Sequence, residues 1–114
     1  MLRTHNCGEL TEKDLDKEVT LCGWVHKRRD HGKLIFIDIR DRYGLTQAVF
    51  IPQKSNPELH AKASILRSEF VILLKGKVQT RPKGTENQKL PTGNVEIFVM
   101  GLEILNPAPW SPST

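Results

Sequence analysis

Lys33-Leu34-Ile35-Phe36-Ile37-Asp38-Ile39-Arg40 decides the fold, because its side chains alternate between two faces with a period of two. The isoleucines at positions 35, 37 and 39 fall on one face of an extended chain. Leu34, Phe36, Asp38 and Arg40 fall on the other face. The stretch therefore predicts a β-strand whose isoleucines pack in a core and whose outer face carries an aromatic ring among polar groups.

Strand patterns on both sides of this stretch predict an all-β fold. Tyr43-Gly44 marks a turn into the next strand, and Asn56-Pro57 supplies an N-cap and a first helical position for a helix that extends to about Ser68. Three strands, one helix and two strands is the order of the OB-fold, a five-stranded, partly open Greek-key barrel with one helix between strands 3 and 4. The expected strands cover residues 19–28, 33–40, 45–51, 70–80 and 95–105.

The composition predicts a single soluble domain. A chain of 114 residues with 38% hydrophobic and 26% charged residues has the balance of an ordinary globular domain. The longest apolar run, residues 70–74, is far shorter than the roughly 20 residues of a membrane span. Residues 1–5 contain no apolar signal segment. We therefore expect neither a membrane protein nor a secreted one.

Proline marks the expected domain boundary. Residues 106–114 contain three of the seven prolines, which block both helix and ladder hydrogen bonds. We expect a domain at residues 1–106, and at residues 107–114 the proline-rich start of a linker to a further domain. The chain is then a piece of a longer protein.

The sequence predicts no metal site. Cys7 and Cys22 form no CxxC pair, so neither a disulfide framework nor a zinc ligand set is expected, and a reducing compartment is the default. Glycine-rich phosphate loops of the GxxxxGK and GxGxxG types are missing from the sequence. Asp38 and Asp41 around Arg40 fit either a metal-dependent phosphodiester site or a charge-balanced strand end.

The basic stretch at residues 26–33 is the first candidate binding feature. It holds Lys27, Arg28, Arg29 and Lys33 against one aspartate, and we interpret it as the connection of the first hairpin. A solvated turn explains such a cluster equally well. The aromatic ring of Phe36 beside it suits stacking on a nucleobase, the alternative being a satellite hydrophobic contact with Leu34.

Two polar residues on other strands complete the candidate site. Gln47 offers both a donor and an acceptor, as reading a base edge requires, although an exposed edge-strand glutamine is as common. Glu96 alternates with Val95 and Ile97 and so leaves the core face. A carboxylate only accepts, so it would select a base edge with an amino group, such as cytosine; an ordinary surface glutamate is the alternative.

Several runs spread over residues 3 to about 107 match a known family. They are Arg3-Thr4-His5, Cys7-Gly8-Glu9-Leu10, residues 19–25, Arg28-Arg29-Asp30, residues 34–42, Gly44, Gln47, Arg67, Glu69-Phe70, Pro91-Thr92-Gly93 and residues 95–97. With these runs the chain resembles the N-terminal anticodon-binding domain of aspartyl-tRNA synthetase in its bacterial and organellar form.

The resemblance implies a role for each candidate residue. Phe36 would stack on the central uridine of the anticodon, and Gln47 would pair with the edge of that base. Glu96 and Arg29 would recognise the third-position cytidine. Lys27, Arg28 and Arg81 would add supporting tRNA contacts.

Lys27 and Gln79 stand where the family often has arginine. Lysine keeps the charge and loses the bidentate fork, so phosphate contact survives better than base readout.

The resemblance also implies a larger protein. That parent would be a homodimeric class II ligase that makes aspartyl-tRNA, with ATP and magnesium bound by a catalytic domain elsewhere in it. These 114 residues by themselves would bind the tRNA-Asp anticodon stem-loop without catalysis and without a cofactor. We expect a cytoplasmic protein, with an organellar matrix as the alternative. A general single-strand-binding OB domain and a protein-interaction module are the competing functions.

Overall fold

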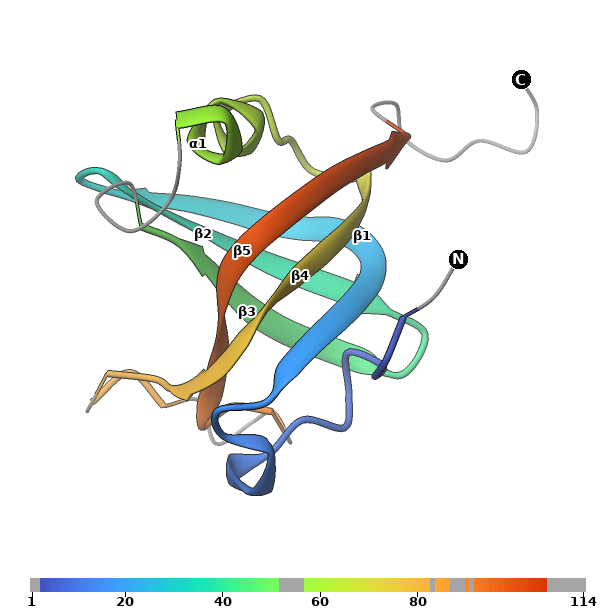
Figure 1. Cartoon of the computed structure of the whole chain (residues 1–114), viewed down its shortest axis with the longest axis vertical. Helices are drawn as coiled ribbons and strands as arrows, with labels where there is room; N and C mark the ends of the chain where they lie inside the picture. Colours follow the sequence, from blue (N-terminus) through green and yellow to red (C-terminus); the bar gives the residue numbers. More distant parts are fainter. Residues whose placement is uncertain (1–2, 52–56, 83, 87–89, 91, 107–114) are drawn as a thin grey trace.

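Five strands, one α-helix and one short 3-10 helix make up the described part of the chain (Figure 1). The computed structural model describes residues 3–51, 57–82, 84–86, 90 and 92–106. The expected linker and the N-cap Asn56 lie outside these residues. The elements in chain order are η1 (Glu12–Asp14), β1 (Glu18–His31), β2 (Leu34–Asp41), β3 (Gly44–Phe50), α1 (Pro57–Ser64), β4 (Val71–Thr80) and β5 (Val95–Asn106).

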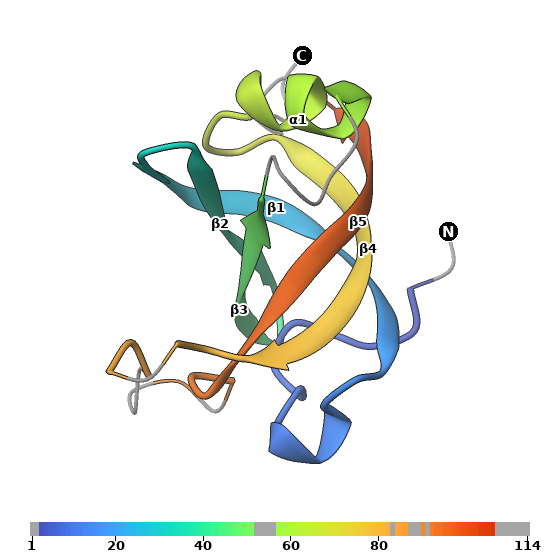
Figure 2. The same cartoon turned by 60° about the vertical axis from the view of Figure 1, so that its left-hand side comes forward.

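The strands form a closed barrel in the order β1-β2-β3-β5-β4. The long strand β1 pairs with β4 through its first half and with β2 through its second half, both antiparallel. A short parallel pairing of β3 with β5 over Gln47 to Val49 closes the barrel, where the sequence analysis expected a partly open one. In both views α1 covers one end of the barrel, and η1 lies at the other (Figures 1 and 2). The predicted OB-fold is confirmed.

The barrel interior is apolar, as the alternation in β2 predicted. Ile37 and Ile39 are fully buried and Ile35 nearly so. Their neighbours in the core come from every strand, from α1 and from the N-terminal segment, and include Leu10, Leu21, Val25, Phe50, Leu59, Leu66, Ile72, Leu74, Ile97 and Val99.

The helix is shorter than expected, because it ends at Ser64 rather than near Ser68. The Leu66 amide bonds to the Ala63 carbonyl at 3.2 Å, a tightened last turn that places the Leu66 side chain in the core. Nη1 of Arg28 donates to the carbonyls of Ser64 (2.7 Å) and Leu66 (3.0 Å). The guanidinium therefore occupies carbonyls that a longer helix would have used itself.

The first hairpin differs from the expectation in its turn. Residues 26–31 belong to β1, and the turn consists of Gly32 and Lys33 alone, with Gly32 at a φ of +59°. The basic stretch is therefore mostly strand. The second turn likewise falls at Arg42 and Tyr43, one residue earlier than expected.

An irregularity in β1 decides which way the basic side chains face. The register steps from Val25 opposite Ile39 to Lys27 opposite Asp38, so His26 is an extra residue in β1. Beyond this bulge the alternation is inverted, because one extra residue exchanges the two faces of a strand. Arg29, opposite Phe36, thereby joins the outer face of β2.

Candidate nucleic-acid interface

A row of polar side chains crosses the outside of the barrel with one residue from each strand. Direct cross-strand partners connect Asp38 on β2 to Gln47 on β3, and Gln47 to Glu96 on β5. Glu96 is in turn the partner of Gln79 on β4, and Asp38 that of Lys27 on β1. Side chains at directly opposed positions lie within reach of each other. We call these five residues the polar row.

Hydrogen bonds join most of this row into one chain. Arg29 holds Asp38 through two parallel bonds, Nη1 to Oδ2 at 2.6 Å and Nη2 to Oδ1 at 3.0 Å. The same Nη2 donates to Oε1 of Gln47 at 2.8 Å. Because arginine has donors only, the Gln47 carbonyl faces Arg29 and its amide faces Glu96.

The hydrogen bonds of the polar row converge on the carboxylate of Glu96. Oε1 accepts from the Gln47 amide and Oε2 from the Gln79 amide, each at 2.8 Å. Glu96 is 3% exposed and Gln47 is 6% exposed, so neither the ordinary surface glutamate nor the exposed edge-strand glutamine describes them. Buried polar groups that satisfy one another in a chain hold a single arrangement.

Arg81 contributes a second cation beside the row. Burial lowers the pKa of Arg81, while the charges of Asp38 and Glu96 oppose that shift. Its Nε donates to the carbonyl of Val95 at 3.2 Å, and its Nη1 to the carbonyl of Thr85 at 3.3 Å. The loop after β4 is thereby tied to the edge of the row.

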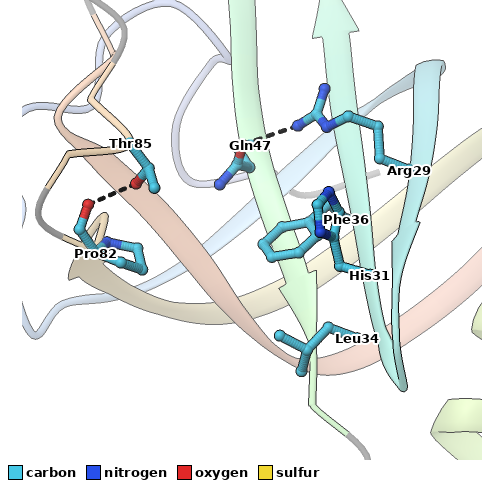
Figure 3. A pocket seen from close by; sticks show the side chains of 7 residues that line it. All are labelled: Arg29, His31, Leu34, Phe36, Gln47, Pro82 and Thr85. Carbon is cyan, nitrogen blue, oxygen red and sulfur yellow. Dashed lines mark hydrogen bonds between the residues drawn. The ribbon is translucent and has the colours of Figure 1, made fainter.

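A hollow of about 290 Å³ opens beside Gln47 and Arg29 (Figure 3). The Phe36 ring lies in it with the His31 ring edge-on, 5.9 Å between centroids and 88° between planes. Across from these rings stand Pro82 and Thr85 of the loop after β4. A flat ring that enters here meets an apolar face on Phe36 and polar groups at Gln47, the arrangement that a nucleobase needs.

The structure brings most of the predicted site residues together. Phe36, Gln47 and Arg29 line the hollow, and Glu96 lies directly behind Gln47. Lys27 stands exposed at the end of the polar row. These positions come from four separate strands, and the barrel places them on one face.

Arg28 lies elsewhere. Besides the two carbonyls at the end of α1, it binds Asp30 through Nε at 2.8 Å and Nη2 at 3.0 Å. These hydrogen bonds lower the pKa of Asp30. Arg28 lines a different hollow, together with His60 and Ser64 of α1. These contacts serve the packing of the helix, and the supporting tRNA contact expected for Arg28 stays a prediction.

The residues that position the site were not predicted as such from the sequence. Asp38 was interpreted only as a strand end or a nuclease carboxylate, yet its place on the Phe36 face was a usable signal. Gln79 was noted only as a place where the family often has arginine, and its bond to Glu96 becomes visible only with the pairing of β4 with β5. His31, Pro82 and Thr85 enter the hollow through turn and loop geometry, which periodicity does not reveal.

The aspartates of the proposed nuclease site are both engaged. Asp38 binds Arg29, and Asp41 accepts hydrogen bonds from the backbone amides of Cys7, Tyr43 and Gly44. Within the described residues, no three His, Cys, Asp or Glu side chains gather as metal ligands would. Among the helices that the structure describes, none is both long and apolar enough to span a bilayer.

Known proteins resemble this chain in sequence and in fold. Aspartate–tRNA(Asp/Asn) ligase of Legionella pneumophila strain Paris is 53% identical over 111 residues, which are 97% of this chain and 18% of that protein. The ligase of the same name from Methylacidiphilum infernorum is 54% identical over 93% of this chain. The chain thus spans about 18% of these relatives.

The structural comparison agrees with the sequence comparison. Asparaginyl-tRNA synthetase of Pyrococcus horikoshii, solved with asparaginyl-adenylate, superposes with a TM-score of 0.79 at 30% identity. The match covers 98% of this chain and 24% of that one. The family of OB-fold nucleic acid binding domains described as tRNA anti-codon matches residues 19–105. With the barrel and the base-sized hollow, this match shows that the chain belongs to the tRNA anti-codon family of OB-fold nucleic acid binding domains.

Proposed function

We propose that this domain reads the anticodon of tRNA-Asp within an aspartate–tRNA ligase. The observation that carries the proposal is the polar row, in which Gln47 lines the base-sized hollow beside the Phe36 ring and is hydrogen-bonded to Glu96 behind it. Two relatives are named as aspartate ligases of tRNA(Asp/Asn), which supports tRNA-Asp as the ligand and makes tRNA-Asn the second candidate. Aminoacylation, with its ATP, magnesium and aspartate, is assigned to other parts of a homodimeric cytoplasmic protein; an organellar one is the alternative.

The central base is read at the hollow. A uridine stacks on Phe36 and meets Gln47 at its edge, where a glutamine supplies both kinds of hydrogen-bonding group. Arg29 holds the Gln47 carbonyl, so the base does not encounter a freely rotating amide. The orientation of the reading group is thus set before the RNA arrives, which reduces the entropy lost on binding.

The third base is read by Glu96 and Arg29. Each oxygen of Glu96 accepts one amide hydrogen bond within the row, and a carboxylate oxygen has room for a second. The amino group of cytidine fits that remaining position, whereas uridine offers an acceptor there. Arg29 retains donors beyond those that bind Asp38 and Gln47.

A titration against three stem-loops tests the proposal. The RNAs are identical except for the anticodons GUC, GUU and UUU, and the salt concentration is held constant because phosphate contacts make affinity salt-dependent. We expect GUC to bind most tightly. Equal binding of GUC and GUU would remove the third-base role of Glu96 and indicate a domain that serves two tRNAs. Equal binding of all three would leave a general single-strand-binding domain.

The variant Glu96→Gln isolates the third base. Glutamine both donates and accepts, so the preference for GUC over GUU should fall by a factor of about 5–100, the worth of one lost base contact of about 1–3 kcal/mol. Glu103→Gln on the exposed side of β5 is the matched control and should retain the full preference. Undiminished discrimination in Glu96→Gln would exclude this residue from base reading.

A further inference from the structure

A second cluster of cationic and aromatic side chains lies at the turn between β2 and β3, at the other end of β2 from the hollow. The Arg3 guanidinium stands 5.2 Å from the centroid of the Tyr43 ring, and that of Arg42 stands 5.7 Å from it. Tyr43 is 54% exposed. We call these three residues the arginine–tyrosine cluster. Two like charges repel each other, so their gathering on one exposed ring favours an anion as the missing partner.

The nearby carboxylate of Asp41 compensates only one of the two cations of the cluster. Oδ1 of Asp41 accepts from the amides of Tyr43 (2.8 Å) and Gly44 (3.1 Å), and Oδ2 accepts from the amide of Cys7 (2.9 Å). Arg3 forms an ion pair with Asp41 at 3.7 Å. In the part of the chain that the structure describes, no carboxylate forms an ion pair with Arg42.

The cluster is held in place by backbone packing. A Cβ atom on Gly8 would lie 2.2 Å from the Tyr43 carbonyl oxygen, and one on Gly44 would lie 2.6 Å from Cα of Gly8. The N-terminal segment therefore touches the turn directly, which only two facing glycines permit. The amide of Thr4, next to Arg3, bonds to the carbonyl of Thr20 at 2.9 Å. Both arginines thus project from fixed backbone.

The cluster borders its own hollow and continues the face that reads bases. The hollow of about 430 Å³ is lined by the cluster, by Asp41, and by Cys22, Gly23 and the half-buried Trp24 of β1. Along β2 the outer face runs from Phe36 through Asp38 to the exposed Arg40, and the turn follows. At a strand rise of about 3.3 Å per residue, Arg42 lies about 20 Å from Phe36.

We propose that the arginine–tyrosine cluster binds the sugar–phosphate backbone of the same RNA, outside the bases that are read. This inference rests on the proposed function. Guanidinium forks match phosphate oxygens, and phosphate contacts on one continuous face fix the register of the bound strand. A protein partner at this hollow is the competing possibility, and the test distinguishes it.

Arg42→Ala in the full chain tests the cluster against the GUC and UUU stem-loops. One lost phosphate contact should weaken both RNAs about tenfold at 0.1 M salt and lower the salt slope by about one unit, with the GUC preference unchanged. Tyr43→Ala should weaken both about threefold by releasing the two guanidiniums, and Tyr43→Phe should behave as the wild type because it keeps the ring. Arg67→Ala, an exposed arginine beyond α1, is the matched control.

The outcomes separate the two proposals. If the wild type prefers GUC and Arg42→Ala binds like Arg67→Ala, the backbone site is wrong and the anticodon site stands. The same result would favour a protein partner over RNA for this hollow. If the wild type does not distinguish the anticodons, the proposed function fails, whatever Arg42→Ala does. A base-selective loss in Arg42→Ala would also overturn the inference, because phosphate contacts carry no sequence information.

Discussion

In the middle of β2, the inner and the outer face are both buried, but by side chains of opposite chemistry. Ile37 is 0% exposed inside the barrel, and its neighbour Asp38 is 8% exposed outside it. The inner face is filled by aliphatic side chains, which tolerate exchange as long as volume is kept. The outer face is covered by a chain of hydrogen bonds in which each group depends on the next. Inner burial stabilises the barrel, whereas outer burial fixes the orientation of the groups that face a ligand.

The largest effect is expected inside the barrel. Ile37→Ala removes fully buried volume and should lower the free energy of unfolding by about 2–5 kcal/mol, measured by urea denaturation. Ile65→Ala, at a side chain that is 56% exposed, should change it by less than about 0.5 kcal/mol. Equal effects of the two variants would contradict the placement of the core.

The next largest effect is expected for RNA binding at the outer face of β2. Phe36→Ala should weaken binding of the GUC stem-loop by about 1–3 kcal/mol, the usual value of one stacked base. Phe36→Leu keeps apolar volume and loses the ring, so it should remain impaired. Recovery of wild-type affinity in Phe36→Leu would show that Phe36 acts through packing rather than through stacking.

The adjacent residues Arg28 and Arg29 should affect different properties of the domain. Arg28→Ala removes the bonds to two carbonyls at the end of α1 and should lower the free energy of unfolding by about 1–2 kcal/mol, with the anticodon preference intact. Arg29→Ala releases Gln47 and should reduce that preference. Thermal unfolding and the stem-loop titration, run on both variants, give the test. If Arg28→Ala lost the anticodon preference and kept full stability, Arg28 would belong to the binding site rather than to the helix packing.

The smallest effect is expected at the exposed end of the polar row. Lys27→Ala should weaken all stem-loops about equally and lower the salt slope by roughly one unit, because a lysine contacts phosphate as a point charge. Lys75→Ala, exposed on β4 and paired with Thr20 and Gly101, is the control and should leave the slope unchanged. A change confined to one anticodon would mean that Lys27 contacts a base.

The alternation of side chains was enough to predict the barrel. Ile35, Ile37 and Ile39 lie in the core as expected. Burial of apolar side chains enforces these periodicities directly, so they are visible in a single sequence. The end of the helix was not predictable, because it depends on Arg28, a residue far away in the chain that binds the carbonyls of Ser64 and Leu66.

The sequence predicted which residues belong to the site, but not how they are arranged. The sequence by itself determined that Phe36 leaves the isoleucine face and that Gln47 and Glu96 carry the hydrogen-bonding groups to read a base. The tertiary structure alone decided that Gln47 and Glu96 are buried against each other, because their contact spans β3 and β5.

The same division applies to the two adjacent arginines. Strict alternation from Val19 would have placed Arg29 inside the barrel and Arg28 outside it. The extra residue His26 inverts that order and turns Arg29 towards Asp38 and Gln47. A bulge is set by the pairing of two strands, so periodicity in β1 alone does not contain it. The residue types came from the sequence, and the face on which each one acts came from the closed barrel.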